Sequence, residues 1–321
     1  MPSPAPNGTQ PRAILLGLCF GLAASLGWGI YNVGVEIGRQ QGFSSADLTL
    51  LRYFGGAAVM LPLMLVLQKS PMQGLTLLRL AVLTIVAGPP FAWFITTGFA
   101  MAPLAHAVVI GPGVTMLVSA ALSRLVDKSP LSGVRLSGMA LLVAGLMFIA
   151  ADRSAAPLPG ATAASTWLGD LCFVVSGTLW GIFTWLMSRW KLDPVSATGA
   201  IAITSTVIFL PVYLTGTTTA VSSTALWAMQ FVYQGVLGGA LAIVFYVLAV
   251  VRLGPIGAGV FPALVPPLAV LLAIPMTGRF PNTPQTIGII VATLGLLVSL
   301  NLPGLFLRWR RRGRNPAKAC V

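Results

Sequence analysis

The sequence predicts an all-helical integral membrane protein whose ten transmembrane helices form two inverted repeats of five helices. Three observations predict this fold: the composition, ten long apolar stretches, and a match between the two halves of the chain. Of 321 residues, 56% are hydrophobic and 8% are charged, whereas an average globular protein carries about 25% charged residues. So little polar surface excludes a water-soluble particle of this size, and so much apolar material excludes a disordered chain.

The apolar stretches approach the length of about 20 residues that a helix needs to cross a hydrocarbon core of about 30 Å. Turn-forming residues such as Lys69-Ser70-Pro71 and Asp193-Pro194 separate them. Each stretch is continuously apolar, which favours helices over the alternating strands of a barrel. The first stretch outruns the apolar region of a signal peptide, so we interpret it as a span. The predicted spans are 14–36, 46–67, 78–99, 102–123, 132–151, 167–189, 196–215, 226–250, 255–276 and 283–303.

Basic residues predict the orientation, because short cytoplasmic loops carry an excess of Lys and Arg. The chain has 19 basic and 6 acidic residues and a net charge of +13. Arg52 falls within a span, and Arg39, Arg153 and Arg279 fall on one side of the membrane. The other basic residues share the other side: Arg12, Lys69, Arg79, Arg124, Lys128, Arg135, Arg189, Lys191, Arg252, Arg308, Arg310, Arg311, Arg312, Arg314 and Lys318. This asymmetry predicts that both termini are cytoplasmic, and it explains the charge without nucleic acid as a partner.

The two halves of the chain match at an offset of 152 residues. Trp28-Gly29-Ile30-Tyr31 corresponds to Trp180-Gly181-Ile182-Phe183, and Pro103-Leu104-Ala105 corresponds to Pro255-Ile256-Gly257. Because each half holds an odd number of spans, the second half is inverted in the membrane relative to the first. The predicted segments are a cytoplasmic N-terminal segment (1–12), the first five-helix repeat (13–151), an external linker (152–166), the second five-helix repeat (167–303) and a basic cytoplasmic tail (304–321).

With these features the chain resembles the EamA-type proteins of the drug/metabolite transporter superfamily. The resemblance rests on the Trp-Gly that opens each repeat, on Arg52 early in the second span, on the pairs Leu61-Pro62 and Leu210-Pro211, and on a short loop before the last helix of each repeat. It implies the EamA fold of ten helices. It also implies secondary active transport of a small organic solute, a metabolite or drug, by alternating access in efflux or exchange.

The chain departs from that family pattern at three places. Family members often have Lys where Glu36 stands, and their loop before the last helix often reads Gly-Glu, a small residue and Pro. Here the first copy of that loop reads Asp127-Lys128-Ser129-Pro130 and the second reads Gly278-Arg279-Phe280-Pro281. The second copy therefore reverses the charge, and a substrate cannot be carried over from other members.

Two further classes of function stay open, a non-transporting receptor or scaffold and, less favoured, an intramembrane enzyme. The sequence offers no paired carboxylates, no His/Asp cluster and no nucleophile with its base, and it has no Walker A motif. Its three cysteines, Cys19, Cys172 and Cys320, form no ligand motif. We therefore expect no catalytic residue, cofactor or metal. The expected partners are a small-molecule solute and, for the tail, anionic lipid, with a homodimer left open. The expected location is the plasma or inner membrane, as a multi-pass protein.

Charged residues predicted within the bilayer are candidates for function, because each costs about 2.5 to 3.5 kcal/mol there. Glu36 and Arg52 flank one hairpin, and three interpretations stay open: a structural pair, a role in solute binding or proton coupling, or Arg52 reaching the interface while Glu36 is solvated. His106, the single histidine, faces a water-filled vestibule or takes part in proton coupling. Asp170 is expected near the interface, with a proton relay as the alternative.

Deep aromatic residues are expected to pack between helices or to form the walls of a solute cavity. Trp28, Trp93, Trp180 and Trp185 belong to this group, and Asn32, Gln230 and Gln234 add polar groups. The expected solute-binding residues are Asn32, Glu36, Arg52, Trp93, His106, Trp180, Trp185 and Gln234.

Glycine and proline predict close helix packing and breaks within the membrane. Three GxxxG pairs are expected to pack helices first and to support dimerisation second: Gly17 and Gly21, Gly34 and Gly38, and Gly235 and Gly239. Breaks are expected at Gly88-Pro89-Pro90, at Gly111-Pro112-Gly113 and at Pro262 with Pro266-Pro267, and they are candidate hinges for the fourth and ninth spans.

Overall fold

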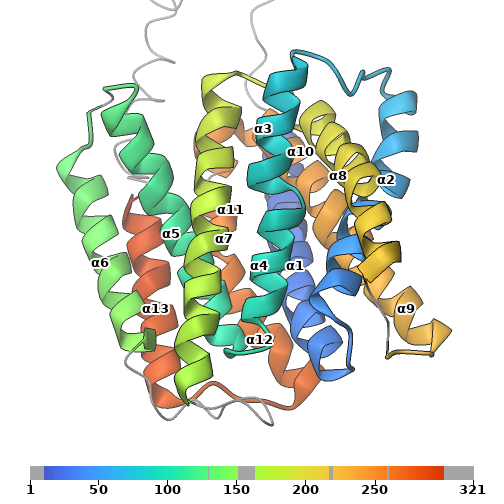
Figure 1. The fold of residues 1–321 in the computed structure, drawn as a ribbon. Coiled ribbons are helices and arrows are strands. Elements are labelled where there is room, and N and C mark those ends of the chain that lie inside the picture. The colour runs from blue at the N-terminus through green and yellow to red at the C-terminus, as the bar shows by residue number, and fades with distance from the viewer. Residues whose placement is uncertain (1–10, 129, 151–162, 217–219, 259, 300–321) are drawn as a thin grey trace, which may run out of the picture.

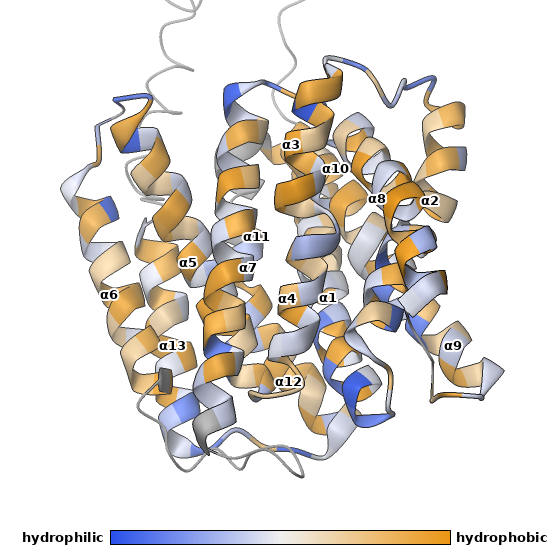
Figure 2. Ribbon diagram, in the orientation of Figure 1, coloured by the Kyte–Doolittle hydropathy of each residue, from blue (hydrophilic) through white to orange (hydrophobic). Residues whose placement is uncertain are grey.

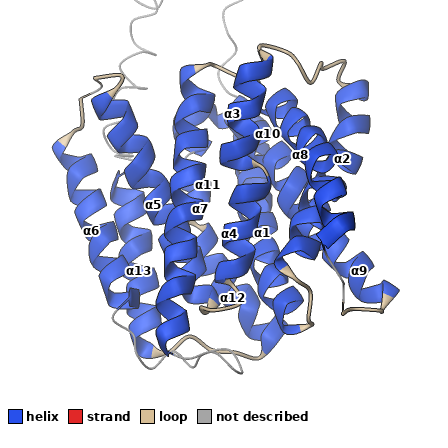
Figure 3. Cartoon of the chain, in the orientation of Figure 1, coloured by secondary structure: helices blue, strands red, loops and turns tan. Residues whose placement is uncertain are grey.

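A computed structural model describes residues 11–128, 130–150, 163–216, 220–258 and 260–299. The described residues form helices joined by loops and contain no strand, as Figure 3 shows. Arg153, the linker and the basic residues of the tail lie outside them, so the expectations for those segments remain predictions.

The helices of each half follow one another along the chain (Figure 1). The first half comprises α1 (Pro11–Gln40), α2 (Ser45–Val66), α3 (Leu77–Ala87), α4 (Pro89–Gly98), α5 (Leu104–Leu125) and α6 (Gly133–Ala150). The second half comprises α7 (Ala163–Arg189), α8 (Pro194–Gly216), α9 (Thr224–Gln230), the π-helix η1 (Phe231–Leu241), α10 (Ala242–Ala258), α11 (Val260–Ala263), α12 (Val265–Thr277) and α13 (Thr283–Ser299).

Within the described residues, seven helices are long and apolar enough to cross a membrane. Three shorter apolar helices, Gly133–Ile149, Val265–Thr277 and Thr283–Ser299, occupy three further predicted spans. Apolar residues run along the helices, and polar residues gather toward their ends (Figure 2). Large apolar side chains such as Leu65 and Leu77 are also exposed on the outside, which suits contact with lipid. The predicted all-helical membrane fold is confirmed.

Prolines break two of the predicted spans, as expected, and leave a third intact. The third span divides at Gly88 into α3 and α4, with prolines opening α4. The segment around Pro266 divides into α11 and α12, and α10 continues to Ala258, so the predicted span 255–276 began too early. The expected break at Pro112 is wrong, because α5 passes through it without interruption. A single proline removes only one backbone donor, which a helix among other helices tolerates.

Contacts between helix ends define two faces of the protein. On the first, which we call the basic face, the residues that follow α2 contact those that precede α8, and the end of α5 contacts the end of α7. On the second, the opposite face, the end of α1 contacts the residues that follow α12, and the starts of α5 and α7 meet. Because α1 ends on the opposite face and its counterpart α7 ends on the basic face, the two halves are inverted.

Contacts between helices recur at equivalent positions of the two halves. The last helices of the halves, α6 and α13, pack side by side (Figure 1), and so do the second helices, α2 and α8. The contact of α5 with α7 has its counterpart in the contact of α12 with α1. Each half therefore buries its apolar surfaces largely against the other half.

Glycines let helices of the two halves approach closely, as predicted for the GxxxG pairs. A methyl group added to Gly235 would lie 2.5 Å from Cα of Gly55, which joins η1 to α2. A methyl group on Gly34 would lie 2.7 Å from Cβ of Tyr233. These glycines serve packing within one chain, which is the first of the two roles expected for them.

Replacing Gly235 by alanine tests this close approach. The new methyl group meets backbone, which cannot move aside, so we expect Gly235→Ala to destabilise the protein by about 1 to 3 kcal/mol. Gly111→Ala is the matched control, because a Cβ there has no neighbour within 4 Å and alanine is the better helix former. Thermal unfolding in detergent measures both variants, and equal melting temperatures would contradict the packing described here.

Candidate functional site

All four ion pairs of the described residues join the first half to the second. Two lie on each face. Breaking an ion pair costs most where one member is buried, as Glu36 and His106 are. The pairs therefore hold the halves together at both ends of the membrane-spanning region.

On the opposite face, Arg279 Nη1 donates to Glu36 Oε1 at 3.3 Å. The Glu36 side chain is only 5% exposed, while that of Arg279 is 49% exposed. The predicted pairing of Glu36 with Arg52 is therefore wrong, and so is the alternative of a solvated Glu36. The physical reason is that α1 packs against α12, which presents the loop holding Arg279 to the end of α1.

On the basic face, Arg189 pairs with Asp127. The Trp185 indole Nε1 donates to the same carboxylate at 2.6 Å, and the Arg189 guanidinium lies 5.3 Å from the Trp185 ring centroid. Trp185, expected in a solute wall, is thus placed beside an ion pair at the end of α7.

The two ion pairs just described are related by the internal repeat. At the offset of 152 residues, Asp127 corresponds to Arg279, and Glu36 corresponds to position 188, next to Arg189. The first half supplies the acid of both pairs, Glu36 and Asp127, and the second half supplies both arginines. The polarity of the pair is reversed between the two faces.

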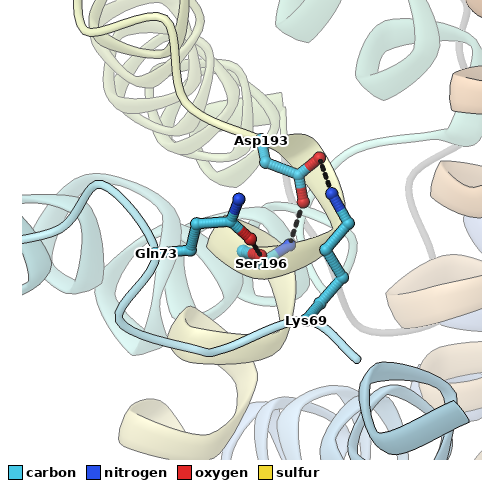
Figure 4. A network of polar contacts seen from close by, with 4 residues as sticks. All are labelled: Lys69, Gln73, Asp193 and Ser196. Carbon is cyan, nitrogen blue, oxygen red and sulfur yellow. Dashed lines mark hydrogen bonds and ion pairs between the residues drawn. The ribbon is translucent and has the colours of Figure 1, made fainter. Parts of the chain in front are cut away.

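A second contact on the basic face is shown in Figure 4. Lys69 Nζ lies 3.2 Å from Asp193 Oδ1, the Ser196 backbone N–H donates to Asp193 Oδ2 at 2.9 Å, and the Ser196 hydroxyl donates to Gln73 Oε1 at 3.3 Å. Burial raises the pKa of Asp193, but the hydrogen bonds from Ser196 and the Lys69 ammonium outweigh burial. The net pKa of Asp193 is below its ordinary value of 3.8.

The lowered pKa of Asp193 predicts how the stability depends on pH. A carboxyl whose pKa is lower in the folded state stabilises the protein above its unfolded pKa, and this contribution is lost as the pH falls through the folded pKa. We expect Asp193→Asn to melt at a lower temperature than the unmodified chain between pH 5 and pH 7, with the gap narrowing below about pH 4. Melting curves in detergent across this range measure the gap. A gap that stays constant down to pH 3 would contradict the geometry in Figure 4.

At the start of α5, His106 Nδ1 lies 2.8 Å from Asp170 Oδ1 of α7. The His106 side chain is 1% exposed and its Nε2 is buried without a hydrogen-bond partner. The expectation of a water-filled vestibule around His106 is therefore wrong. Sequence reasoning missed the pair because 64 residues separate its members. The available signal was that both residues lie near helix starts on the predicted external side.

A double-mutant cycle tests whether His106 and Asp170 interact energetically. Removing one partner leaves a buried polar group unpaired, so His106→Ala and Asp170→Ala should each destabilise the protein, and the double variant should lose less than the sum. We expect a coupling of about 1 to 3 kcal/mol in thermal or denaturant unfolding in detergent. Strictly additive losses would show that the two side chains do not stabilise each other.

Arg52 lies in the interior and is 7% exposed, which excludes the interpretation that it reaches the interface. Its guanidinium carbon lies 4.6 Å from the Tyr31 ring centroid and 5.4 Å from that of Phe91. Its Nη1 is buried without a hydrogen-bond partner. Stacking on aromatic faces stabilises a desolvated cation by about 2 kcal/mol or more, which offsets part of the cost of a charge in the bilayer.

Aromatic contacts link Arg52 to both halves of the protein. The Tyr53 hydroxyl donates to the carbonyls of Ala87 and Gly88 at 2.8 and 2.6 Å, which fastens α2 to the break between α3 and α4. The Phe91 and Trp180 ring centroids are 4.7 Å apart, so the second half contributes Trp180 to this group of aromatic residues. We call Tyr31, Arg52, Tyr53, Phe91 and Trp180 the Arg52 cluster.

A second group of buried polar side chains lies where η1 begins. Gln230 Nε2 donates to the Gly34 carbonyl at 3.0 Å, and Gln234 Nε2 donates to Gln230 Oε1 at 3.0 Å. Gln234 Oε1 is buried without a partner. A methyl group on Gly238 would lie 2.3 Å from the ring of Tyr31, so η1 packs directly against the Arg52 cluster. Such π-helical segments are frequent at functional sites.

Besides Glu36, His106 and Trp185, which lie at the two faces, two more of the expected solute-binding residues stand apart from the Arg52 cluster. Trp93 is 44% exposed and contacts Phe209, with ring centroids 6.3 Å apart. Asn32 is half-buried, and its Nδ2 donates to the Trp28 carbonyl one turn earlier in its own helix at 2.8 Å. Their roles in solute binding remain predictions.

The fold and these contacts define a helical membrane protein built from two inverted halves. The model of the EamA-like transporter family matches residues 15–151 and 167–301, once for each half. The chain therefore belongs to the EamA-like transporter family, as its resemblance implied, and it is a membrane transporter.

Solved structures support the fold. Twenty-two chains match, among them a crystal structure described only as that of a protein, with a TM-score of 0.63 and 17% sequence identity over 92% of this chain and 98% of the other. At this identity the likeness establishes the fold alone. The comparison with curated proteins gave no match.

Proposed function

We propose that the protein is a secondary active transporter that moves a small organic solute across the plasma or inner membrane by alternating access. In this proposal both termini are cytoplasmic, so the basic face is cytoplasmic. Membership of a transporter family supports the part of the proposal that makes the protein a membrane transporter. The ion pairs between the halves support the mechanism.

The observation that carries the mechanism is the relation between the pairs Glu36–Arg279 and Asp127–Arg189. They lie on opposite faces, occupy positions related by the repeat, and both join the halves. In an inverted repeat, alternating access exchanges the arrangement of one half for that of the other around a central site. Opening the opposite face breaks the first pair while the second holds, and opening the basic face reverses this.

The Arg52 cluster is the proposed solute site. It lies within the helices rather than at their ends, it contains groups from both halves, and its aromatic walls with few polar groups suit a small organic molecule. Gln234 adds a buried acceptor on η1, the helix whose Gly238 packs against the ring of Tyr31.

Flux measured with purified protein in liposomes tests the transport activity. We expect saturable uptake of at least one labelled class among amino acids, nucleosides, cationic drugs and organic acids, with a pH gradient or a counter-solute as the driving force. Empty liposomes are the control. Folded protein without flux for any of these classes under either gradient would favour a receptor or scaffold instead.

Neutralising and exchanging charges tests the role of the opposite-face pair. Glu36→Gln and Arg279→Gln should each lower flux by about fivefold or more, because either change shifts the balance between the two open states. The exchanged variant, Glu36→Arg with Arg279→Glu, should regain part of it. Arg39→Gln is the matched control, because Arg39 lies on the same face and donates to the carbonyl of Phe43 within its own half. Undiminished flux in both single variants would show that the pair takes no part in transport.

A further inference from the structure

Arg52 is a buried cation that no acid of the described chain accompanies. Five acidic residues are described, and each is engaged elsewhere. Their partners are, in chain order, Arg279 for Glu36, Tyr213 for Asp47, Arg189 for Asp127, His106 for Asp170 and Lys69 for Asp193. The positive charge in the Arg52 cluster is therefore left for something outside these residues to balance.

The aromatic rings around Arg52 balance that charge only in part. Rings interact with the flat faces of a guanidinium, whereas its N–H groups point outward in its plane and need acceptors. Nη1 has none, although it is buried. The hydroxyl of Tyr31 beside it is also buried without a hydrogen-bond partner. Arg52 Nη1 and the Tyr31 hydroxyl are thus two buried polar groups without a hydrogen-bond partner, on side chains that contact each other.

We propose that Arg52 binds the carboxylate of the transported solute, so that the solute is an organic anion with an apolar or aromatic body. This inference rests on the proposed function and names its substrate class. A carboxylate fits the planar fork of arginine with two parallel hydrogen bonds, and its second acceptor positions suit the Tyr31 hydroxyl. The rings of Phe91 and Trp180, 4.7 Å apart, continue to Phe183, also 4.7 Å from Trp180, and provide the apolar surface.

Three probes that share one body test the charge that the site selects. These are 3-phenylpropionate, 3-phenylpropanol and 3-phenylpropylamine, which differ only in the acid, alcohol or amine at the chain end. We expect the acid alone to raise the melting temperature of the purified protein in detergent, with an effect that saturates as its concentration rises. In liposomes, the acid alone should compete with the transported solute or exchange for it. Equal effects of the alcohol or the amine would overturn the proposal.

Variants of Arg52 locate the binding. Arg52→Gln should weaken binding of the acid by about tenfold or more, and Arg52→Lys, which keeps the charge and loses the fork, should lie between. Arg252→Gln should bind as the unmodified chain does; Arg252 also lies over a ring, 4.8 Å from the centroid of Phe20, but belongs to another part of the protein. Undiminished binding in Arg52→Gln would overturn the assignment.

Failure of the anion site and failure of the proposed transport activity give different results. Saturable flux of a neutral or cationic solute, without binding of the acid, would overturn the anion site and leave the transporter intact. If Arg52→Gln fails to fold, Arg52→Lys and the three probes on the unmodified chain still test the carboxylate site, because these experiments keep the positive charge at position 52.

Discussion

Ion pairs at the helix ends join the two halves of the protein, and this constraint organises the molecule. The chain has few charges to arrange, 8% of its residues. Within the described part, each ion pair takes one member from each half. The halves are therefore held together by contacts that neither can make alone, in addition to the apolar packing of α6 on α13 and of α2 on α8.

These contacts suit the proposed transporter, which alternates between two open states. Apolar surfaces between helices have little directional preference, whereas an ion pair with a buried member such as Glu36 is costly to break. In the proposed alternating-access cycle, each end state keeps the pair on one face and loses the pair on the other. The reversed polarity of the pairs, with both acids in the first half, means that the two ends are not chemically identical. The exposed side chain of Arg279 and the buried one of Glu36 show the same asymmetry within one pair.

Much of the fold follows from the sequence because it depends on local composition and on chain order. Apolar stretches predicted the helices, and the match of Trp28-Gly29 with Trp180-Gly181 predicted the inverted halves. The partners of the charged side chains could not be predicted in this way. Glu36 was expected to contact Arg52, its neighbour across a short hairpin, but its partner Arg279 is 243 residues away. Such a contact depends on which helices pack together, and the hydrophobic pattern of a helix buried on several sides does not reveal this. The π-helical form of η1 was not predicted either, because the apolar pattern of its residues does not distinguish it from an α-helix.

In the proposed cycle, the pair Glu36–Arg279 on the opposite face must break each time solute is transported. Cysteines introduced by Glu36→Cys and Arg279→Cys, in a chain without Cys19, Cys172 and Cys320, can be joined by a reducible bifunctional thiol reagent. A spacer is needed because a direct disulfide tolerates only short separations. Solute flux in liposomes, measured before cross-linking, after it and after reduction, gives the decisive comparison. We expect flux to stop on cross-linking and to return on reduction, whereas full flux through the cross-linked protein would show that the pair need not break.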